Sequence, residues 1–199
     1  MFRRAILLAV VGLLPCGLRP SAFANPGASV SIAAAANLVF ALDALRAEFK
    51  RTAPAIAVTT ATGASGSLYA QIKQGAPFDV FLSADTEYPA QIAAQGLGPA
   101  ASLRTFATGR LVVWTTRTDL DLNDLAAVVR AATVRKIAIA QPKTAPYGRA
   151  ARATLEKLGA WRDVQSKIVM GESISQTAQF VETGNADLGL VALSLVQSP

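Results

Sequence analysis

The stretch IAAAANLVFALDALRAEF, residues 32–49, decides the fold of this chain. Its small apolar residues predict a strand, which ends directly before Asn37. Apolar residues then recur at helical spacing from Leu38 to Phe49 and predict an amphipathic helix. A strand that runs straight into a helix leaves free backbone N–H groups at the helix start, which is the geometry of an anion site.

The same strand-to-helix pattern recurs three times along the chain. It is found in GASGSLYAQI (63–72), TAPYGRAARATL (144–155) and GESISQTAQFV (171–181). Four helix starts are therefore available to offer uncharged hydrogen-bond donors to one ligand.

Short and nearly continuous apolar runs indicate strands that are covered on both faces. They lie at 30–35, 56–61, 80–82, 111–115, 137–140 and 188–191, and helical patterns lie between most of them. This alternation predicts an α/β fold with parallel sheets, whose ligands bind at the carboxyl ends of the strands.

The stretch from Gly96 to Gly109 is rich in glycine and small residues and interrupts this periodicity. We interpret it as a crossover between two α/β lobes that enclose a cleft. The predicted domains are a first lobe over residues 25–107 and a second lobe over residues 108–199.

Residues 1–24 have the features of a secretory signal peptide. Two arginines precede an apolar run over residues 5–14, and the sequence Ala-Phe-Ala ends at Ala24 with small residues suited to cleavage. The apolar run is too short to span a bilayer comfortably. Processing of a lipoprotein at Cys16 is an alternative, although Pro15 is a poor match to the small residue that such sites use. We expect an exported protein.

Composition excludes several classes of chemistry. The one cysteine, Cys16, lies in the predicted signal peptide, and the chain has no histidine. Ser-His-Asp and Cys-His catalysis, disulfides and thiolate metal sites are therefore absent from the mature chain. Three of the 19 basic residues lie in residues 1–24, which leaves 16 against 13 acidic residues. This small, scattered excess does not indicate nucleic-acid binding.

Polar residues at the helix starts each allow two interpretations. Asn37 either caps its own helix or turns its amide NH2 group to a ligand. Ser65 either caps a Gly/Ser turn or donates its hydroxyl to a ligand, and the buried packing of Tyr147 competes with a ligand role in the same way. The segment around Ser65 is neither a P-loop nor a nucleophile elbow, because it lacks the lysine of the first and the spacing of the second.

Other polar residues have structural explanations. Ser173 and Gln176 fit a capping box, in which Ile174 contributes an ordinary core side chain. Asp79 and Asp85 are expected to fix the turn after a strand and to cap the next helix. Lys143 and Arg149 flank Tyr147 and are expected to be solvated surface residues, and the alternative is that they attract an anion without touching it.

The motifs AAAAN, GASGSL, GAPFDVFLSAD, PKTAPYGR, GESIS and LGLVALS resemble, in this order, the periplasmic molybdate- and tungstate-binding proteins of ABC importers. The resemblance implies the two-lobed, type II periplasmic binding protein fold. It also implies that the oxyanion is bound by Ala36, Asn37, Ser65, Tyr147 and Ile174, with Ala36 and Ile174 contributing backbone N–H groups. Family members continue beyond the last of these motifs, so we expect the chain to lack C-terminal elements and the second lobe to be incomplete.

The function that this resemblance implies is capture of molybdate or tungstate and delivery to the membrane permease of an ABC importer. It implies a periplasmic monomer that is not an enzyme and that has no cofactor, no direct cation ligands and no nucleic-acid partner. Three alternatives remain at this point: a binding protein for sulfate or another small anion, a regulator's effector-binding domain, and a hydrolase that uses Ser65.

Overall fold

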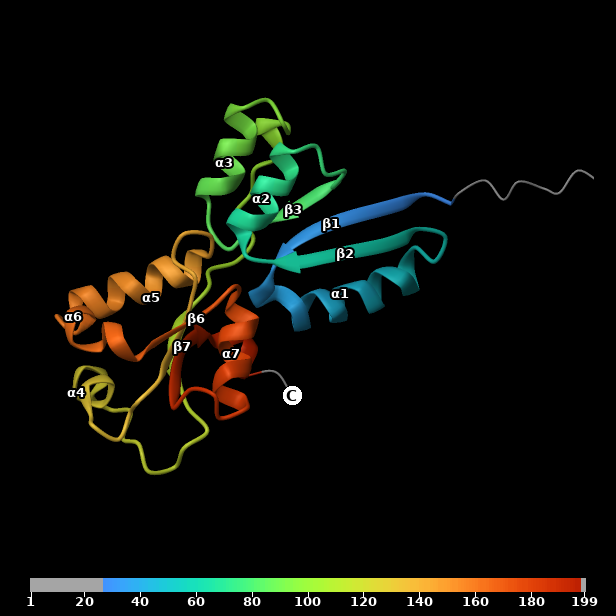
Figure 1. Cartoon of the computed structure of the whole chain (residues 1–199). Helices are drawn as coiled ribbons and strands as arrows, with labels where there is room; N and C mark the ends of the chain where they lie inside the picture. The colour runs from blue at the N-terminus through green and yellow to red at the C-terminus, as the bar shows by residue number, and fades with distance from the viewer. Residues whose placement is uncertain (1–26, 198–199) are drawn as a thin grey trace, which may run out of the picture.

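A computed structural model describes residues 27–197, and the predicted signal peptide lies outside them (Figure 1). The described strands form two separate sheets. The first sheet holds β1 (Ser29–Ala35), β2 (Ala57–Gly63) and β3 (Val80–Leu82). The second holds β4 (Leu111–Trp114), β5 (Ile137–Ala140), β6 (Ile168–Gly171) and β7 (Leu188–Ala192).

Helices connect most of these strands. The α-helices are α1 (Val39–Thr52), α2 (Ser65–Lys73), α3 (Glu87–Ala94), α4 (Leu125–Arg130), α5 (Pro146–Lys157), α6 (Trp161–Val164), α7 (Ile174–Glu182) and α8 (Leu193–Val196). Three 3-10 turns are η1 (Ala36–Leu38), η2 (Ala100–Ser102) and η3 (Gln165–Lys167). Among residues 27–197, none of the helices is both long and apolar enough to cross a membrane.

The first sheet has the strand order β2-β1-β3 with all strands parallel. The chain leaves β1 toward one edge and then returns across it to the other. Because such crossovers are right-handed, α1 and α2 lie on opposite faces of the sheet, as Figure 1 shows. The ends of β1 and β2 are in register, with Ala35 beside Gly63.

The second sheet has the order β4-β7-β5-β6, and its one antiparallel pair corrects the prediction of wholly parallel sheets. Strand β4 runs against β7, with Leu111 beside Ala192. It is an edge strand that the chain reaches from the first sheet after α3, η2 and the crossover segment.

Strand β6 is absent from the strands predicted from sequence. It lies at the sheet edge with Met170 47% exposed, and its apolar run of three residues, Ile168 to Met170, is short. Helix α2 begins at Ser65, so this residue lies in the first turn of the helix and not in the preceding loop. The predicted lobe boundaries fall between the two sheets and stay a prediction.

The hydrophobic cores of the two halves differ in depth. The second sheet buries a cluster that includes Val129, Ile137, Ile139, Leu155, Leu188 and Leu190 between its helices. Helix α1 buries only Leu42 and leaves Leu45 and Phe49 exposed, although the sequence placed all three on one apolar stripe.

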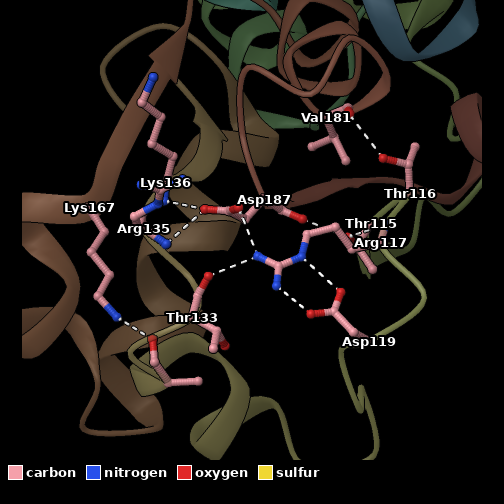
Figure 2. Close-up of polar contacts among 11 residues, drawn as sticks. Thr115, Thr116, Arg117, Asp119, Thr133, Arg135, Lys136, Lys167, Val181 and Asp187 are labelled. Atoms are coloured by element: carbon pink, nitrogen blue, oxygen red, sulfur yellow. Dashed lines mark hydrogen bonds and ion pairs between the residues drawn. The ribbon is translucent and has the colours of Figure 1, made fainter.

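Asp187 organises the end of the second sheet opposite the cleft residues described below (Figure 2). Its Oδ2 atom accepts the backbone N–H groups of Arg135 at 2.7 Å and Lys136 at 2.8 Å, and its Oδ1 atom accepts from Arg117 at 2.9 Å. Burial by itself raises the pKa of the Asp187 carboxyl, but these donors outweigh burial and hold the pKa below its ordinary value. The ionised carboxylate thereby joins the starts of β5 and β7 to the segment after β4.

We expect Asp187→Asn to lower the free energy of unfolding by about 1–3 kcal/mol at neutral pH, because it weakens hydrogen bonds to a charged group. The depressed pKa gives stability that is present above the unfolded value of about 3.9 and is lost as the pH falls through the folded value. The difference in free energy of unfolding between the parent and Asp187→Asn should therefore become smaller in acid. Urea unfolding at several pH values measures this, and Asp119→Asn is the control, since Asp119 bonds the same Arg117 from a side chain that is 63% exposed. Equal stability of Asp187→Asn and the parent at neutral pH would contradict the assignment.

Candidate functional site

A small cavity lies between the two sheets, with about 190 Å³ of space free of protein atoms when its mouth is included. Residues from four helix starts and one loop line it. They are Ala35, Ala36, Asn37, Gly63, Ala64, Ser65, Ala84, Ala145, Pro146, Tyr147 and Ile174. The structure thus brings all five sequence-predicted site residues to one place.

The topology of the sheets explains this convergence. In the first sheet the lining residues follow the carboxyl ends of β1 and β2, and in the second they follow those of β5 and β6. Each sheet reverses its winding direction at an inner strand, β1 in the first and β5 in the second. Ligands of α/β sheets bind in the crevice at such switch points, and here the two crevices face each other.

Backbone donors surround the cavity at the helix starts. Helix α2 begins at Ser65, α5 at Pro146 and α7 at Ile174. The capping residues of α2 and α5 are Ala64 and Ala145, which make no side-chain capping bond. Since the first N–H groups of a helix have no partner within it, these starts present donors and the positive end of the helix dipole to the cavity.

Ser65 is completely buried, and its hydrogen bonding orients it as a donor. The Oγ atom accepts the backbone N–H of Ala84 at 3.0 Å. A serine hydroxyl carries one proton, so the bond from Ala84 occupies a lone pair and leaves that proton for an acceptor in the cavity.

Asn37 does not cap α1, which corrects one of the two sequence interpretations. It lies inside the 3-10 turn η1, and neither η1 nor α1 has a side-chain capping bond. The residue is 9% exposed, and its Oδ1 atom is buried without a hydrogen bond to any described residue. An amide presents its NH2 group in the same place after a half-turn of its last side-chain torsion, so Asn37 has unused polar capacity beside the cavity.

Tyr147 packs against the crossover segment. A Cβ atom on Gly109 would collide with the Tyr147 hydroxyl, so a side chain there would displace the ring. Burial raises the pKa of Tyr147 and keeps the phenol neutral and able to donate. The ring also belongs to a buried cluster with Ala36, Ala64 and Ile174. Packing and hydrogen-bond donation are therefore compatible here.

The start of α7 combines capping with a contact to the opposite half. Ser173 Oγ accepts the N–H of Gln176 at 3.3 Å, as the capping box predicts, although Gln176 Oε1 accepts from Glu172 at 2.7 Å instead of from Ser173. Ser175 Oγ donates to the carbonyl of Ala36 at 2.9 Å.

Ser194 Oγ likewise donates to the carbonyl of Asn37 at 2.8 Å. The sequence gives no sign of either serine bond, because each joins residues more than a hundred positions apart. Together they fix the peptide groups of the Ala36-Asn37 turn.

The charged residues considered at the sequence level lie outside the cavity lining. Asp79 accepts the N–H of Ser31 at 2.7 Å and so ties the start of β3 to β1. Asp85 accepts the N–H of Tyr88 in the first turn of α3 at 3.2 Å, which agrees with the expected capping role. Lys143 is exposed as expected, whereas Arg149 forms an ion pair with Asp85. Within residues 27–197 no cluster of three acidic, cysteine or histidine residues suits a metal ion.

Comparison with known proteins assigns the family. Residues 30–199 match the family described as bacterial extracellular solute-binding protein. The molybdate-binding protein ModA of Azotobacter vinelandii is 40% identical over 193 residues, which cover 97% of this chain and 73% of that protein. The chain belongs to the ModA branch of this solute-binding family.

Other relatives agree with this assignment. ModA of Rhodobacter capsulatus is 45% identical over 70% of the chain, although the match spans only 54% of that relative's length. The solved periplasmic molybdate-binding protein of Azotobacter vinelandii aligns with a TM-score of 0.78 at 36% identity, and covers 82% of this chain and 71% of its own. The predicted family and the type II fold of this solute-binding protein are confirmed.

Gly148 sets how closely α5 approaches β5 beneath the cavity, because a Cβ atom there would strike the carbonyl oxygen of Ala140. We expect Gly148→Ala to lower the free energy of unfolding by about 1–3 kcal/mol, since overpacking against backbone outweighs the gain of about 1 kcal/mol in helix preference. Urea unfolding tests this. Gly63→Ala is the control, because its Cβ meets only Leu68 at 3.8 Å. A Gly148→Ala protein as stable as the parent would show that α5 has room to move.

Proposed function

We propose that this protein captures molybdate or tungstate in the cavity between its two sheets and delivers the oxyanion to an ABC importer. The ligand residues are Ala36, Asn37, Ser65, Tyr147 and Ile174. The proposal agrees with the molybdate-binding relatives, whose names state that ligand. The family consists of solute carriers, so the protein is not an enzyme, and molybdate is its cargo and not a cofactor.

The observation that carries this proposal is the lining of the cavity, in which four helix starts meet and every lining residue is uncharged. A dehydrated oxyanion needs many hydrogen-bond donors to replace its water. Backbone N–H groups, the Ser65 hydroxyl and an amide supply them, and the helix dipoles favour negative charge at the same point.

Selectivity follows from the kind and spacing of these donors. A lining that only donates favours an anion without protons of its own, since a protonated ligand needs an acceptor. Molybdate and tungstate are similar in size and larger than sulfate, so we expect selection by size to act against sulfate but not to separate molybdate from tungstate. Closure of the two lobes is favoured by contacts that the ligand makes with both.

The location and the partners of the protein are also inferred from its family. The homologous solved structure is a periplasmic protein. We propose the same compartment for this chain, reached through the signal peptide at residues 1–24, and action as a monomer on a membrane permease. No nucleic acid takes part.

Isothermal titration of the purified protein with molybdate, tungstate and sulfate tests the function, after circular dichroism has verified folding. We expect one-to-one binding of molybdate and tungstate and no heat from sulfate. A preference for sulfate would favour the alternative anion carrier. A folded protein that binds none of the three would overturn the proposal for this chain.

We expect Ser65→Ala to weaken oxyanion binding by about 1–3 kcal/mol, because it removes a donor to a buried charged ligand. The control is Ser67→Ala on the same helix, since Ser67 is exposed and does not line the cavity. Thermal unfolding of both variants separates a loss of binding from the loss of the Ala84 hydrogen bond. Unchanged affinity in folded Ser65→Ala would remove Ser65 from the ligand set.

A further inference from the structure

Arg149 reaches from α5, on the second sheet, to a cluster that belongs to the first. Its Nη2 atom pairs with Asp85 Oδ2 and lies 3.4 Å from Glu87 Oε2. Its Nη1 atom donates to the Tyr88 hydroxyl at 3.1 Å, and the guanidinium lies 5.3 Å from the centre of the Tyr88 ring. One side chain therefore makes an ion pair, a hydrogen bond and a cation–π contact across the two halves.

Asp85, the ion-pair partner of Arg149, is held in place by hydrogen bonds within the first half of the molecule. Asp85 Oδ1 accepts the Ser83 hydroxyl at 3.0 Å and the N–H of Tyr88 at 3.2 Å. The Asp85 side chain is only 19% exposed. Its other oxygen is thus fixed toward Arg149, so formation of the pair orders few additional groups.

The same cluster touches the cavity-forming helix starts. A Cβ atom on Gly66 would lie 2.5 Å from the Tyr88 hydroxyl and 2.7 Å from the carbonyl oxygen of Thr144, and the Gly66 N–H donates to that carbonyl at 2.8 Å. Gly66 follows Ser65 on α2, whereas Thr144 precedes the start of α5. The Arg149 contacts therefore form where these two helix starts come together.

We propose that Arg149 and Asp85 form a latch that stabilises the closed arrangement of the two lobes and thereby tightens oxyanion binding without touching the ligand. This inference rests on the proposed function. Both are positioning residues, since neither lines the cavity. The alternative role for Arg149, long-range attraction of the anion, is opposed by the two carboxylates that surround its single positive charge.

The test compares two variants with a control on the same helix. Arg149→Gln removes the cation, and Asp85→Asn removes the carboxylate charge but keeps an oxygen for the Tyr88 N–H. The control is Arg152→Gln, because Arg152 bonds Glu156 at 2.8 Å and stacks on Trp161 at 5.2 Å, all within the second half. Molybdate affinity and dissociation rate are measured for each, together with thermal unfolding.

A latch predicts that Arg149→Gln and Asp85→Asn each weaken molybdate binding by roughly three- to thirtyfold, through faster dissociation. The double variant should be no weaker than the worse single variant. Arg152→Gln should bind like the parent.

The Asp85→Asn result separates the latch from simple electrostatics, because loss of a negative charge near the cavity would by itself tighten anion binding. Tighter binding by this variant, or parent-like binding by Arg149→Gln, would overturn the latch. If Asp85→Asn does not fold, the latch is tested by comparing the molybdate affinities of Arg149→Gln and Arg152→Gln.

Failure of the proposed function has a different signature, since the parent itself would then bind no molybdate. In that case small-angle X-ray scattering of the ligand-free proteins decides about the latch. A larger radius of gyration for Arg149→Gln than for Arg152→Gln supports it, and equal radii overturn it.

Discussion

Backbone hydrogen-bond donors at four helical starts are the constraint on which this structure depends. The first N–H groups of α2, α5 and α7 and of the turn η1 have no partner within their own helices, and the residues beside them are buried around one cavity. Buried donors are costly unless an acceptor meets them. Each sheet provides only half of the ring of donors, so the two sheets satisfy the requirement of an anion only by facing each other at their carboxyl ends.

Small side chains make this arrangement possible. Ala36, Ala64 and Ala145 occupy the positions next to the donors, where a larger residue would hold a ligand away from the backbone. The side chain of Ser65 adds a donor whose direction is set by the Ala84 N–H. Recognition by backbone and neutral groups needs this close approach, and that explains why alanine dominates a functional site in which no residue type suggests chemistry by itself.

Local patterns predicted the alternation of strands and helices because burial on both faces leaves a continuous apolar run, as in β1 and β5. They did not predict β6, an edge strand whose apolar run spans only three residues, or the direction of β4, which depends on pairing and not on its own residues. The gathering of the site residues was predicted by resemblance and by the rule for strand ends. The contacts of Ser175 with Ala36 and of Arg149 with Asp85 were not predicted, since the partners lie 139 and 64 residues apart in the sequence.

The separation of charge from the cavity follows from the same physics. A guanidinium inside the cavity would bind any small anion strongly, because opposite charges attract regardless of shape in a poorly screened space. Neutral donors attract less and discriminate more, since their benefit depends on distance and direction. Arg149 and Asp85 place the strong, less directional attraction outside the cavity, where it acts between the two halves of the protein. In this arrangement the contacts that join the lobes are distinct from the contacts that choose the ligand, so the strength of closure and the selectivity of binding can change independently.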